Sequence, residues 1–301
     1  MWIIAGTVPD PDFSLLTPAL TASPDVLPRL SGPELLLPDG RNVPVERGTA
    51  ALAATALQTC AALSCPPPAL LLAGDTGSGS GSRSLYAWLE QALPDLAPHG
   101  LTFHYLFPDV DWHNRLLLAV QALPQTPLMV ADAGFMYVAK MSGYADAYAL
   151  FTPDVGELAF LADEKAPHPF YTRGFLLAEE QNIPALLARA QAHGNCPADL
   201  LIKGRADHVI HQGQTYAVVD SPSVPAMECI GGTGDIVTGL VTGLLCTGLP
   251  VAPAALAAAR LARRLAAHCR PDPATPVSHL IAALPEVLPR SAGEAALLGQ
   301  P

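Results

Sequence analysis

Short apolar runs rich in β-forming residues alternate with longer helical segments along most of the chain. This alternation is typical of a parallel β-sheet that is covered by helices. The predicted strands are Trp2–Ala5, Ala69–Ala73, Leu101–Leu106, Leu128–Ala131, Ala149–Thr152 and Leu200–Lys203, with a hairpin at His208–Ile210 and Thr215–Val219. The predicted helices are Thr49–Ala62, Ser84–Ala92, Arg115–Ala122, Met136–Tyr148, Val155–Ala162, Pro184–His193, Thr233–Thr247 and Ala252–His268. The sequence therefore predicts an α/β fold with a central, mostly parallel sheet flanked by helices.

The chain has 301 residues, enough for one large α/β domain or two small ones. No break in composition separates two domains, so we expect a single domain over residues 1–290. Residues 21–47 are rich in Pro and Gly and are expected to form an irregular surface excursion. Residues 291–301 are expected to form a loose C-terminal tail.

The overall charge disfavours nucleic acid as a partner. The formal net charge is −11 and only 14% of the residues are charged. An anionic ligand therefore needs a local site built from backbone amides and a few Lys or Arg side chains. The six cysteines form no CxxC pair, the amino terminus lacks the basic region of a signal peptide, and no run approaches the roughly 18 apolar residues of a membrane span. We expect a soluble, cytoplasmic protein.

The stretch Gly231-Gly232-Thr233-Gly234-Asp235 comes directly before an apolar run that is predicted to be helical. Glycines allow successive N–H groups to converge on an anion, and a helix N-terminus adds partial positive charge. A carboxylate at such a turn suits the task of accepting a proton from a hydroxyl that attacks a phosphoryl group. The alternative is a plain Gly-rich turn in which Asp235 is only an N-terminal helix residue.

A second Gly-rich stretch begins at Gly74 and Asp75, after an apolar strand, and runs to Ser82 before a predicted helix. Ligands settle at the carboxyl end of a parallel sheet in such strand-loop-helix arrangements. The stretch matches neither of the common Gly-rich nucleotide motifs. It fits a flexible loop that closes over a substrate and a simple connector equally well.

Asp154 and Glu157 follow a predicted strand and are three residues apart, so both carboxylates lie on one side of a first helical turn. They could bind Mg²⁺, which commonly joins one or two carboxylates to nucleotide phosphates. They could instead form a capping box, with Asp154 as N-cap. Lys203 lies at the end of another predicted strand. It could bind an anionic ligand there, or it could be an ordinary surface lysine.

Taken in order, these motifs resemble the ribokinase-like superfamily, and within it the NAD(P)H-hydrate dehydratases. The matching segments are GGTGDIVTGLVTGLL, FTPDVGEL, LIKG, VADAGF at Val130–Phe135 and GTAALAATALQ at Gly48–Gln58. The resemblance implies a three-layer sandwich with nucleotide and substrate meeting at the edge of the sheet. It also implies an enzyme that uses ADP or ATP with Mg²⁺ to repair hydrated NAD(P)H, with a homo-oligomeric assembly possible.

The resemblance assigns roles to individual residues. Asp235 is similar to the catalytic base, and Glu157 to the acid that organises the metal ion. The anion hole would consist of Gly232, Thr233 and Gly234. The nucleotide contacts would be Lys203 and Gly231, and the substrate contacts would be Gly74, Asp75, Asp132 and Asp154.

The chain departs from the family pattern mainly on the substrate side. Asp154 replaces a histidine of the family, which brings the segment closer to sugar and vitamin kinases. Gly134 and Tyr137 stand where the family offers an acid and an amide. Two alternatives to the dehydratase therefore remain: a kinase acting on a sugar or vitamin-like alcohol, and a catalytically silent nucleotide-binding protein.

Overall fold

The computed structural model describes residues 1–18, 27–165 and 182–301. Its centre is an eight-stranded sheet with the strand order β11-β10-β9-β8-β7-β6-β1-β5. The strands are β1 (Trp2–Val8), β5 (Ala69–Gly74), β6 (Gly100–His104), β7 (Leu128–Ala131), β8 (Leu150–Phe151), β9 (Leu200–Ile202), β10 (Asp207–His211) and β11 (Gln214–Val219). Pairing is parallel from β5 to β9, and only β10 and β11 add antiparallel pairs. The predicted α/β class with its hairpin is confirmed.

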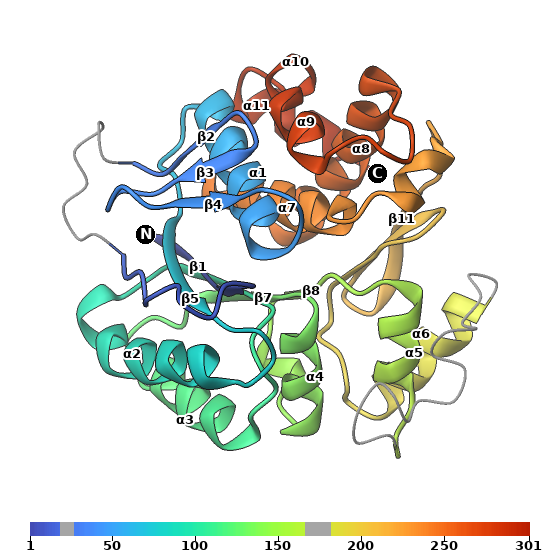
Figure 1. The fold of residues 1–301 in the computed structure, drawn as a ribbon. Coiled ribbons are helices and arrows are strands. Elements are labelled where there is room, and N and C mark those ends of the chain that lie inside the picture. Colours follow the sequence, from blue (N-terminus) through green and yellow to red (C-terminus); the bar gives the residue numbers. More distant parts are fainter. Residues whose placement is uncertain (19–26, 166–181) are drawn as a thin grey trace.

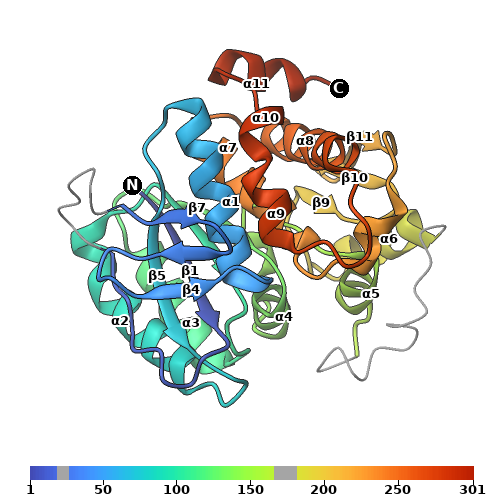
Figure 2. The same cartoon turned by 45° about the horizontal axis from the view of Figure 1, so that its top comes forward.

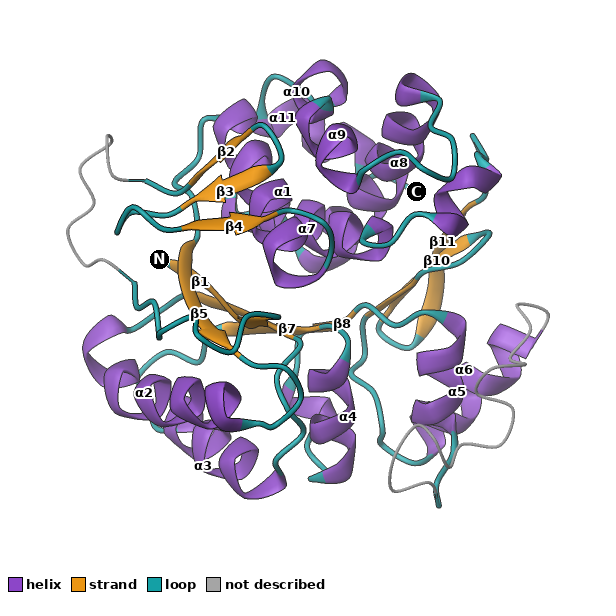
Figure 3. Ribbon diagram, viewed as in Figure 1, coloured by secondary structure: helices purple, strands orange, loops and turns teal. Residues whose placement is uncertain are grey.

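Helices cover both faces of this sheet, so the molecule has three layers (Figures 1 and 3). One face carries α1 (Gly48–Leu63), α7 (Thr233–Cys246), α8 (Val251–Cys269), α9 (Val277–Ala282), α10 (Leu284–Val287) and α11 (Ala292–Leu298). The other carries α2 (Ser80–Leu96), α3 (Val110–Gln121), α4 (Gly134–Met141), α5 (Val155–Ala162) and α6 (Ile183–Ala192). Among the described residues no helix is long and apolar enough to cross a membrane.

The sheet separates two apolar cores. Strand β1 is buried along its whole length, and its side chains alternate between the two faces. Ile4 and Val8 belong to the core under α1, α7 and α8, whereas Ile3 and Ala5 belong to the core under α2 to α6. Such two-sided burial explains why the strands read as continuous apolar runs in the sequence.

The excursion expected at residues 21–47 is not irregular over its described part, 27–47. It forms an antiparallel sheet of β2 (Arg29–Ser31), β3 (Glu34–Leu36) and β4 (Asn42–Pro44), which lies in front of α1 (Figure 2). Leu35 and Val43 are buried and join the core under α1. Gly32, Pro33, Pro38 and Gly40 lie in its turns, so they mark the ends of short strands rather than the absence of structure. Residues 21–26 lie outside the described part.

The expectation of a loose tail at 291–301 is also wrong, because residues 292–298 form α11. Ser291 caps this helix by accepting a hydrogen bond from the Glu294 N–H at 3.2 Å. Ala295 is fully buried, and Arg260 of α8 donates hydrogen bonds to the carbonyl oxygens of Leu298 and Gln300 at 2.7 and 2.6 Å. The segment is ordered by this distant arginine, which local sequence patterns do not reveal.

Helices α1 and α7 pack closely because α7 presents glycines to its neighbour. A Cβ atom at Gly239 would lie 2.5 Å from the Leu52 carbonyl oxygen and 2.6 Å from Thr55 Cβ. A Cβ atom at Gly243 would lie 2.5 Å from Thr59 Cβ. The close approach therefore depends on side chains of minimal size, and it fixes the position of the N-terminus of α7.

We expect Gly239→Ala to lower the free energy of unfolding by about 1–3 kcal/mol, since the added methyl group must push α1 and α7 apart. Urea denaturation measures this loss. Gly293→Ala is the matched control, because the nearest atom to its new Cβ is Ser291 Oγ at 3.8 Å. Stability equal to wild type in the Gly239 variant would show that the two helices tolerate a wider separation.

Candidate active site

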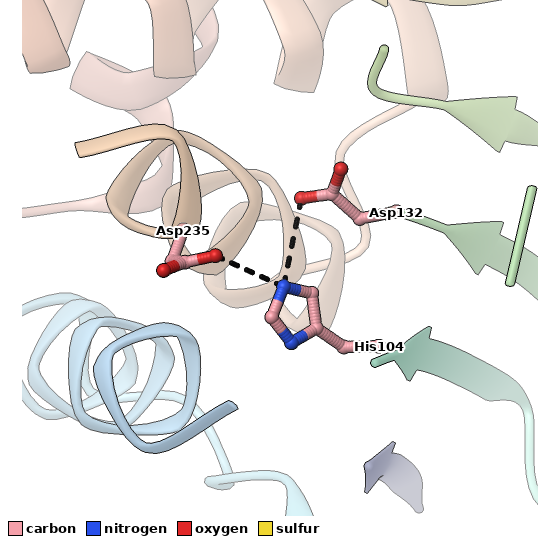
Figure 4. A group of neighbouring side chains, drawn as sticks. All are labelled: His104, Asp132 and Asp235. Atoms are coloured by element: carbon pink, nitrogen blue, oxygen red, sulfur yellow. Dashed lines mark hydrogen bonds and ion pairs between the residues drawn. The ribbon is translucent and has the colours of Figure 1, made fainter. Parts of the chain in front are cut away.

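Four ionisable side chains meet at the carboxyl edge of the parallel sheet. His104 is the last residue of β6, Asp132 follows β7, Lys203 follows β9, and Asp235 lies in the first turn of α7. Carboxyl ends of neighbouring parallel strands share one edge of a sheet, which explains why residues so far apart in sequence converge. We call these four residues the ionic cluster; Figure 4 shows His104 between the two carboxylates.

The ionic cluster is tightly connected and shielded from solvent. His104 Nε2 lies 2.9 Å from Asp235 Oδ1 and 3.9 Å from Asp132 Oδ2. Lys203 Nζ donates to both Asp132 oxygens at 2.9 and 3.1 Å, and Thr238 Oγ1 donates to Asp132 Oδ2 at 2.5 Å. The residues His104, Asp132 and Asp235 are exposed by only 0, 2 and 8%. Asp132 therefore pairs with the Lys203 ammonium group, and Asp235 accepts a hydrogen bond from His104.

Asp235 is held as an ionised carboxylate. The Gly48 N–H donates to its Oδ2 at 2.5 Å. Burial pushes its pKa up, but the hydrogen bond and charge of His104, the Gly48 N–H and the charge of Lys203 outweigh burial and leave the pKa below its usual value. A carboxylate in this state at neutral pH can accept a proton, which is the role predicted for it.

The Gly-rich turn before α7 has the geometry of an anion site. Gly232 is the N-cap residue with φ +94°, a conformation that favours glycine. The first N–H groups of α7, which include that of Asp235, have no partners within the helix. Thr233 Oγ1 instead donates to the carbonyl oxygens of Met227 and Ile230, both at 3.2 Å, and so stabilises the turn. The anion-hole roles of Gly232, Thr233 and Gly234 therefore rest on backbone N–H groups and stay a prediction.

Two further features border this turn. A Cβ atom at Gly234 would lie 3.5 Å from Lys203 Nζ, so the ammonium group lies close to the turn. A pocket of about 320 Å³ lies between β3, β4 and the start of α9, and Val277 is one of its lining residues. Val277 also borders the turn, because a Cβ atom at Gly232 would lie 3.1 Å from Val277 Cγ2. Gly231 is exposed at the same side. Nucleotide contacts by Lys203 and Gly231 stay a prediction, since Lys203 already pairs with Asp132.

Asp154 and Glu157 form the capping box that the sequence offered as one alternative. Asp154 Oδ1 accepts from the Glu157 N–H at 2.7 Å, and Glu157 Oε2 accepts from the Asp154 N–H at 2.8 Å. Tyr137 donates to Glu157 Oε1 at 3.2 Å. Burial and the charge of Asp154 raise the pKa of Glu157 to about 8, although Lys203 opposes this.

The capping box does not exclude a metal role for Glu157. The Lys203 N–H donates to the Pro153 carbonyl oxygen at 2.7 Å, so the two loops after β8 and β9 are joined and Glu157 lies beside the ionic cluster. Each Glu157 oxygen accepts one hydrogen bond and keeps a lone pair for a cation or a metal-bound water. The donor set fits Mg²⁺, which needs few protein carboxylates when phosphates complete its shell.

A metal ion inside the ionic cluster is less suitable. His104, Asp132 and Asp235 offer ligand atoms that lie within 4.8 Å of one another. Both Asp132 oxygens, however, accept from the Lys203 ammonium group, and both Asp235 oxygens accept hydrogen bonds. Lys203 thus already serves as the cation of this cluster.

The loop from Gly74 to Ser82 is organised by Asp75. Its carboxylate accepts from the N–H groups of Gly77, Gly79 and Ser82, each at 3.0 Å, and from Ser82 Oγ at 2.8 Å. Burial raises the pKa of Asp75, but these hydrogen bonds outweigh it and lower the pKa overall. The structure thus favours the connector alternative for this loop, and the substrate contacts predicted for Gly74, Asp75, Asp132 and Asp154 stay predictions.

Sequence reasoning missed His104 and its partner Thr49. His104 Nδ1 lies 3.0 Å from Thr49 Oγ1, so both ring nitrogens are bonded. A single histidine inside the predicted strand 101–106 gave no pattern to recognise. Its position near the carboxyl end of that strand was the one available signal.

A Gly-rich helix N-terminus with a buried carboxylate, placed at the carboxyl edge of a three-layer sheet, defines the class of ribokinase-like proteins. A family model described as NAD(P)H-hydrate dehydratase, of the carbohydrate kinase type, matches residues 96–288. The chain belongs to this family. This membership makes it an enzyme of the carbohydrate kinase-like superfamily.

Three individual proteins are similar to this chain. An uncharacterized protein of Methanocaldococcus jannaschii is 35% identical over 220 residues, which cover 73% of this chain and 90% of the relative. The pyridoxal kinase of Lactobacillus plantarum superposes with a TM-score of 0.51 at 17% identity, covering 94% of this chain and 96% of the kinase. A putative phosphomethylpyrimidine kinase of Bacteroides thetaiotaomicron gives a TM-score of 0.53 at 15% identity, covering 79% and 92%. These two structures support the fold.

Proposed function

We propose that the protein is an ADP- or ATP-dependent NAD(P)H-hydrate dehydratase. The observation that carries the proposal is Asp235, a buried and ionised carboxylate in the first turn of α7, directly after the Gly-rich N-cap. The family match supports the choice of substrate. Phosphoryl transfer needs a base at the attacking hydroxyl and hydrogen-bond donors at the transferred phosphoryl group, and the proposal assigns both roles to this turn.

The proposed reaction has two steps. Asp235 accepts the proton of the ring hydroxyl while that oxygen bonds to the terminal phosphorus of the nucleotide, whose bridging P–O bond breaks. The N–H groups of Gly232, Thr233 and Gly234 stabilise charge on the transferred phosphoryl group. The lone pair of the ring nitrogen then expels phosphate, and loss of a neighbouring ring proton restores the dihydronicotinamide. Mg²⁺, when bound through Glu157, would neutralise phosphate charge.

A small-molecule kinase is the second candidate, because one observation favours it. Tyr137 bonds to Glu157 where the family offers an amide to the substrate, and Asp154 replaces the family's histidine. Such changes on the substrate side fit a different alcohol. In that case the reaction would stop after phosphoryl transfer.

Turnover of hydrated NADH with Mg²⁺ and either ADP or ATP tests the proposal. We expect the absorbance of reduced nicotinamide to return with kcat/KM above roughly 10⁴ M⁻¹s⁻¹, an ordinary value for an enzyme on its own substrate. Nucleotide consumption only with a sugar or a pyridine alcohol would replace the dehydratase with a kinase. Neither activity, with nucleotide binding intact, would indicate a silent binding protein.

Glu157→Gln is expected to raise the Mg²⁺ concentration required for half-maximal activity severalfold. The amide keeps both hydrogen bonds of the capping box but carries no charge for the metal ion. Glu294→Gln is the matched control, since Glu294 also closes a helix start through Ser291 and lies on α11. An unchanged Mg²⁺ requirement would leave Glu157 with the capping role alone.

A further inference from the structure

We infer that His104 is a positioning residue that orients the Asp235 carboxylate and keeps it ready to accept the substrate proton. The inference rests on the proposed function, because it concerns the same base. The inference goes beyond the proposed function because it assigns a role to a side chain that cannot touch the substrate. His104 is 0% exposed and so can act only through Asp235.

The ring of His104 is fixed at both nitrogens. Nδ1 is bonded to Thr49 Oγ1 of α1 at 3.0 Å, and Nε2 to Asp235 Oδ1 of α7 at 2.9 Å. The ionised Asp235 carboxylate can only accept, so the imidazole Nε2–H donates to it, and the Thr49 hydroxyl bonds to Nδ1 on the other side of the ring.

The backbone leaves room for this arrangement. A Cβ atom at Gly6 of β1 would lie 2.6 Å from the His104 carbonyl oxygen and 2.6 Å from Thr49 Oγ1. The absence of a side chain at Gly6 therefore allows Thr49 to reach the imidazole. Residues from β1, α1, β6 and α7 all contribute to the placement of one carboxylate.

Asp235 is anchored at two points that define the plane of its carboxylate. Gly48 N–H bonds to Oδ2, and His104 bonds to Oδ1. Gly48 and Thr49 are consecutive, so the start of α1 supports both anchors, one directly and one through the imidazole. The remaining lone pairs of Asp235 are thus held in a set direction for an incoming hydroxyl group.

The charges around His104 predict how its removal will act. Asp235 and Asp132 face the ring at 2.9 and 3.9 Å, Lys203 faces Asp132 from the other side, and the Tyr105 ring lies edge-on at 4.3 Å. Burial raises the pKa of Asp235, and His104 is the main group that offsets this. Without His104 the pKa of Asp235 should rise. Asp235 must be deprotonated to act as the base. As the pH falls, a variant without His104 should therefore lose activity at a higher pH than wild type does.

The test compares His104→Leu and His104→Gln with wild type over the pH range. We expect the Leu variant to lose about 10-fold to 100-fold in kcat/KM at pH 7, the range that a hydrogen bond to a charged group supports. The acid limb of its pH profile, where kcat/KM falls with decreasing pH, should move to higher pH by about one unit or more. The Gln variant retains an N–H donor and should recover much of both effects. KM for the nucleotide should not change.

Two controls keep the inference falsifiable. His113 is buried on α3 and bonded to Tyr148 and Ser142 at 2.8 and 2.9 Å, so His113→Leu should lower stability without moving the acid limb. Thr49→Val removes the hydroxyl at nearly constant volume and serves if the Leu variant does not fold. Equal pH profiles for wild type, His104→Leu and Thr49→Val would reduce His104 to a packing residue.

A readout without turnover separates this inference from the proposed function. Carbon-13 NMR of aspartate-labelled protein, with the Asp235 signal assigned through Asp235→Asn, follows the carboxyl titration directly. An Asp235 titration that moves to higher pH in His104→Leu supports the inference even if hydrated NADH is not a substrate. A titration at the wild-type position overturns it, whatever the activity.

Discussion

Asp235→Asn is expected to reduce turnover by about 10²-fold to 10⁴-fold, the usual cost of removing a general base. The amide can still accept the Gly48 hydrogen bond but cannot take a proton from the substrate. The variant keeps the shape of the side chain and removes one buried negative charge near the Lys203 ammonium group. Nucleotide affinity should therefore stay within a few fold of wild type.

Steady-state kinetics and nucleotide titration measure the two parts of this expectation separately. Asp199→Asn is a suitable control, since Asp199 is a buried carboxylate that bonds to His211 and the Gln212 N–H. It should change stability and leave turnover near wild type. Wild-type activity in Asp235→Asn would remove Asp235 from the mechanism.

Lys203→Met is expected to lower the free energy of unfolding by about 3–5 kcal/mol. It removes the ammonium group that bonds to both oxygens of Asp132, and it leaves a buried carboxylate without its ion-pair partner. The pKa of Lys203 is lowered by burial, but the charges of Asp132 and Glu157 outweigh this and raise it above its usual value. Lys203 therefore stays protonated across the neutral range.

Urea denaturation of two further variants distinguishes the loss of the Lys203–Asp132 ion pair from the loss of a cationic side chain in general. Asp132→Asn with Lys203→Met should recover part of the loss, since no unpaired charge remains. Arg115→Met breaks an exposed pair with Glu90, in which the Arg115 side chain is 54% exposed, and should cost less than about 1 kcal/mol. A cost this small for Lys203→Met would show that Thr238 and the Ala133 N–H satisfy Asp132 without the lysine.

The strand and helix pattern predicted the central fold well because its elements are long or strongly apolar. Leu128–Ala131 and Val155–Ala162 form a strand and a helix with the expected ends. Helix prediction at Met136–Tyr148 went too far, since α4 ends at Met141 and Gly143 takes φ +75°. Short elements such as β2 and α11 escaped prediction, because contacts with α1 and α8 order them.

The site was predictable only where a motif is local. Asp235 and its turn are contiguous in sequence, and so is the capping pair of Asp154 and Glu157. The bonds of His104 to Thr49 and Asp235 span 55 and 131 residues, and that of Lys203 to Asp132 spans 71. The order of the strands in the sheet brings these partners together, and no short segment of the sequence predicts that order.

The small sheet of β2, β3 and β4 has a direct covalent route to the base. Only Val45, Glu46 and Arg47 separate the end of β4 from Gly48, whose N–H anchors Asp235. The position of β4 therefore restricts where the Gly48 N–H can lie. The small sheet thus helps to hold one of the two anchors of the Asp235 carboxylate, although it lies outside the eight-stranded sheet.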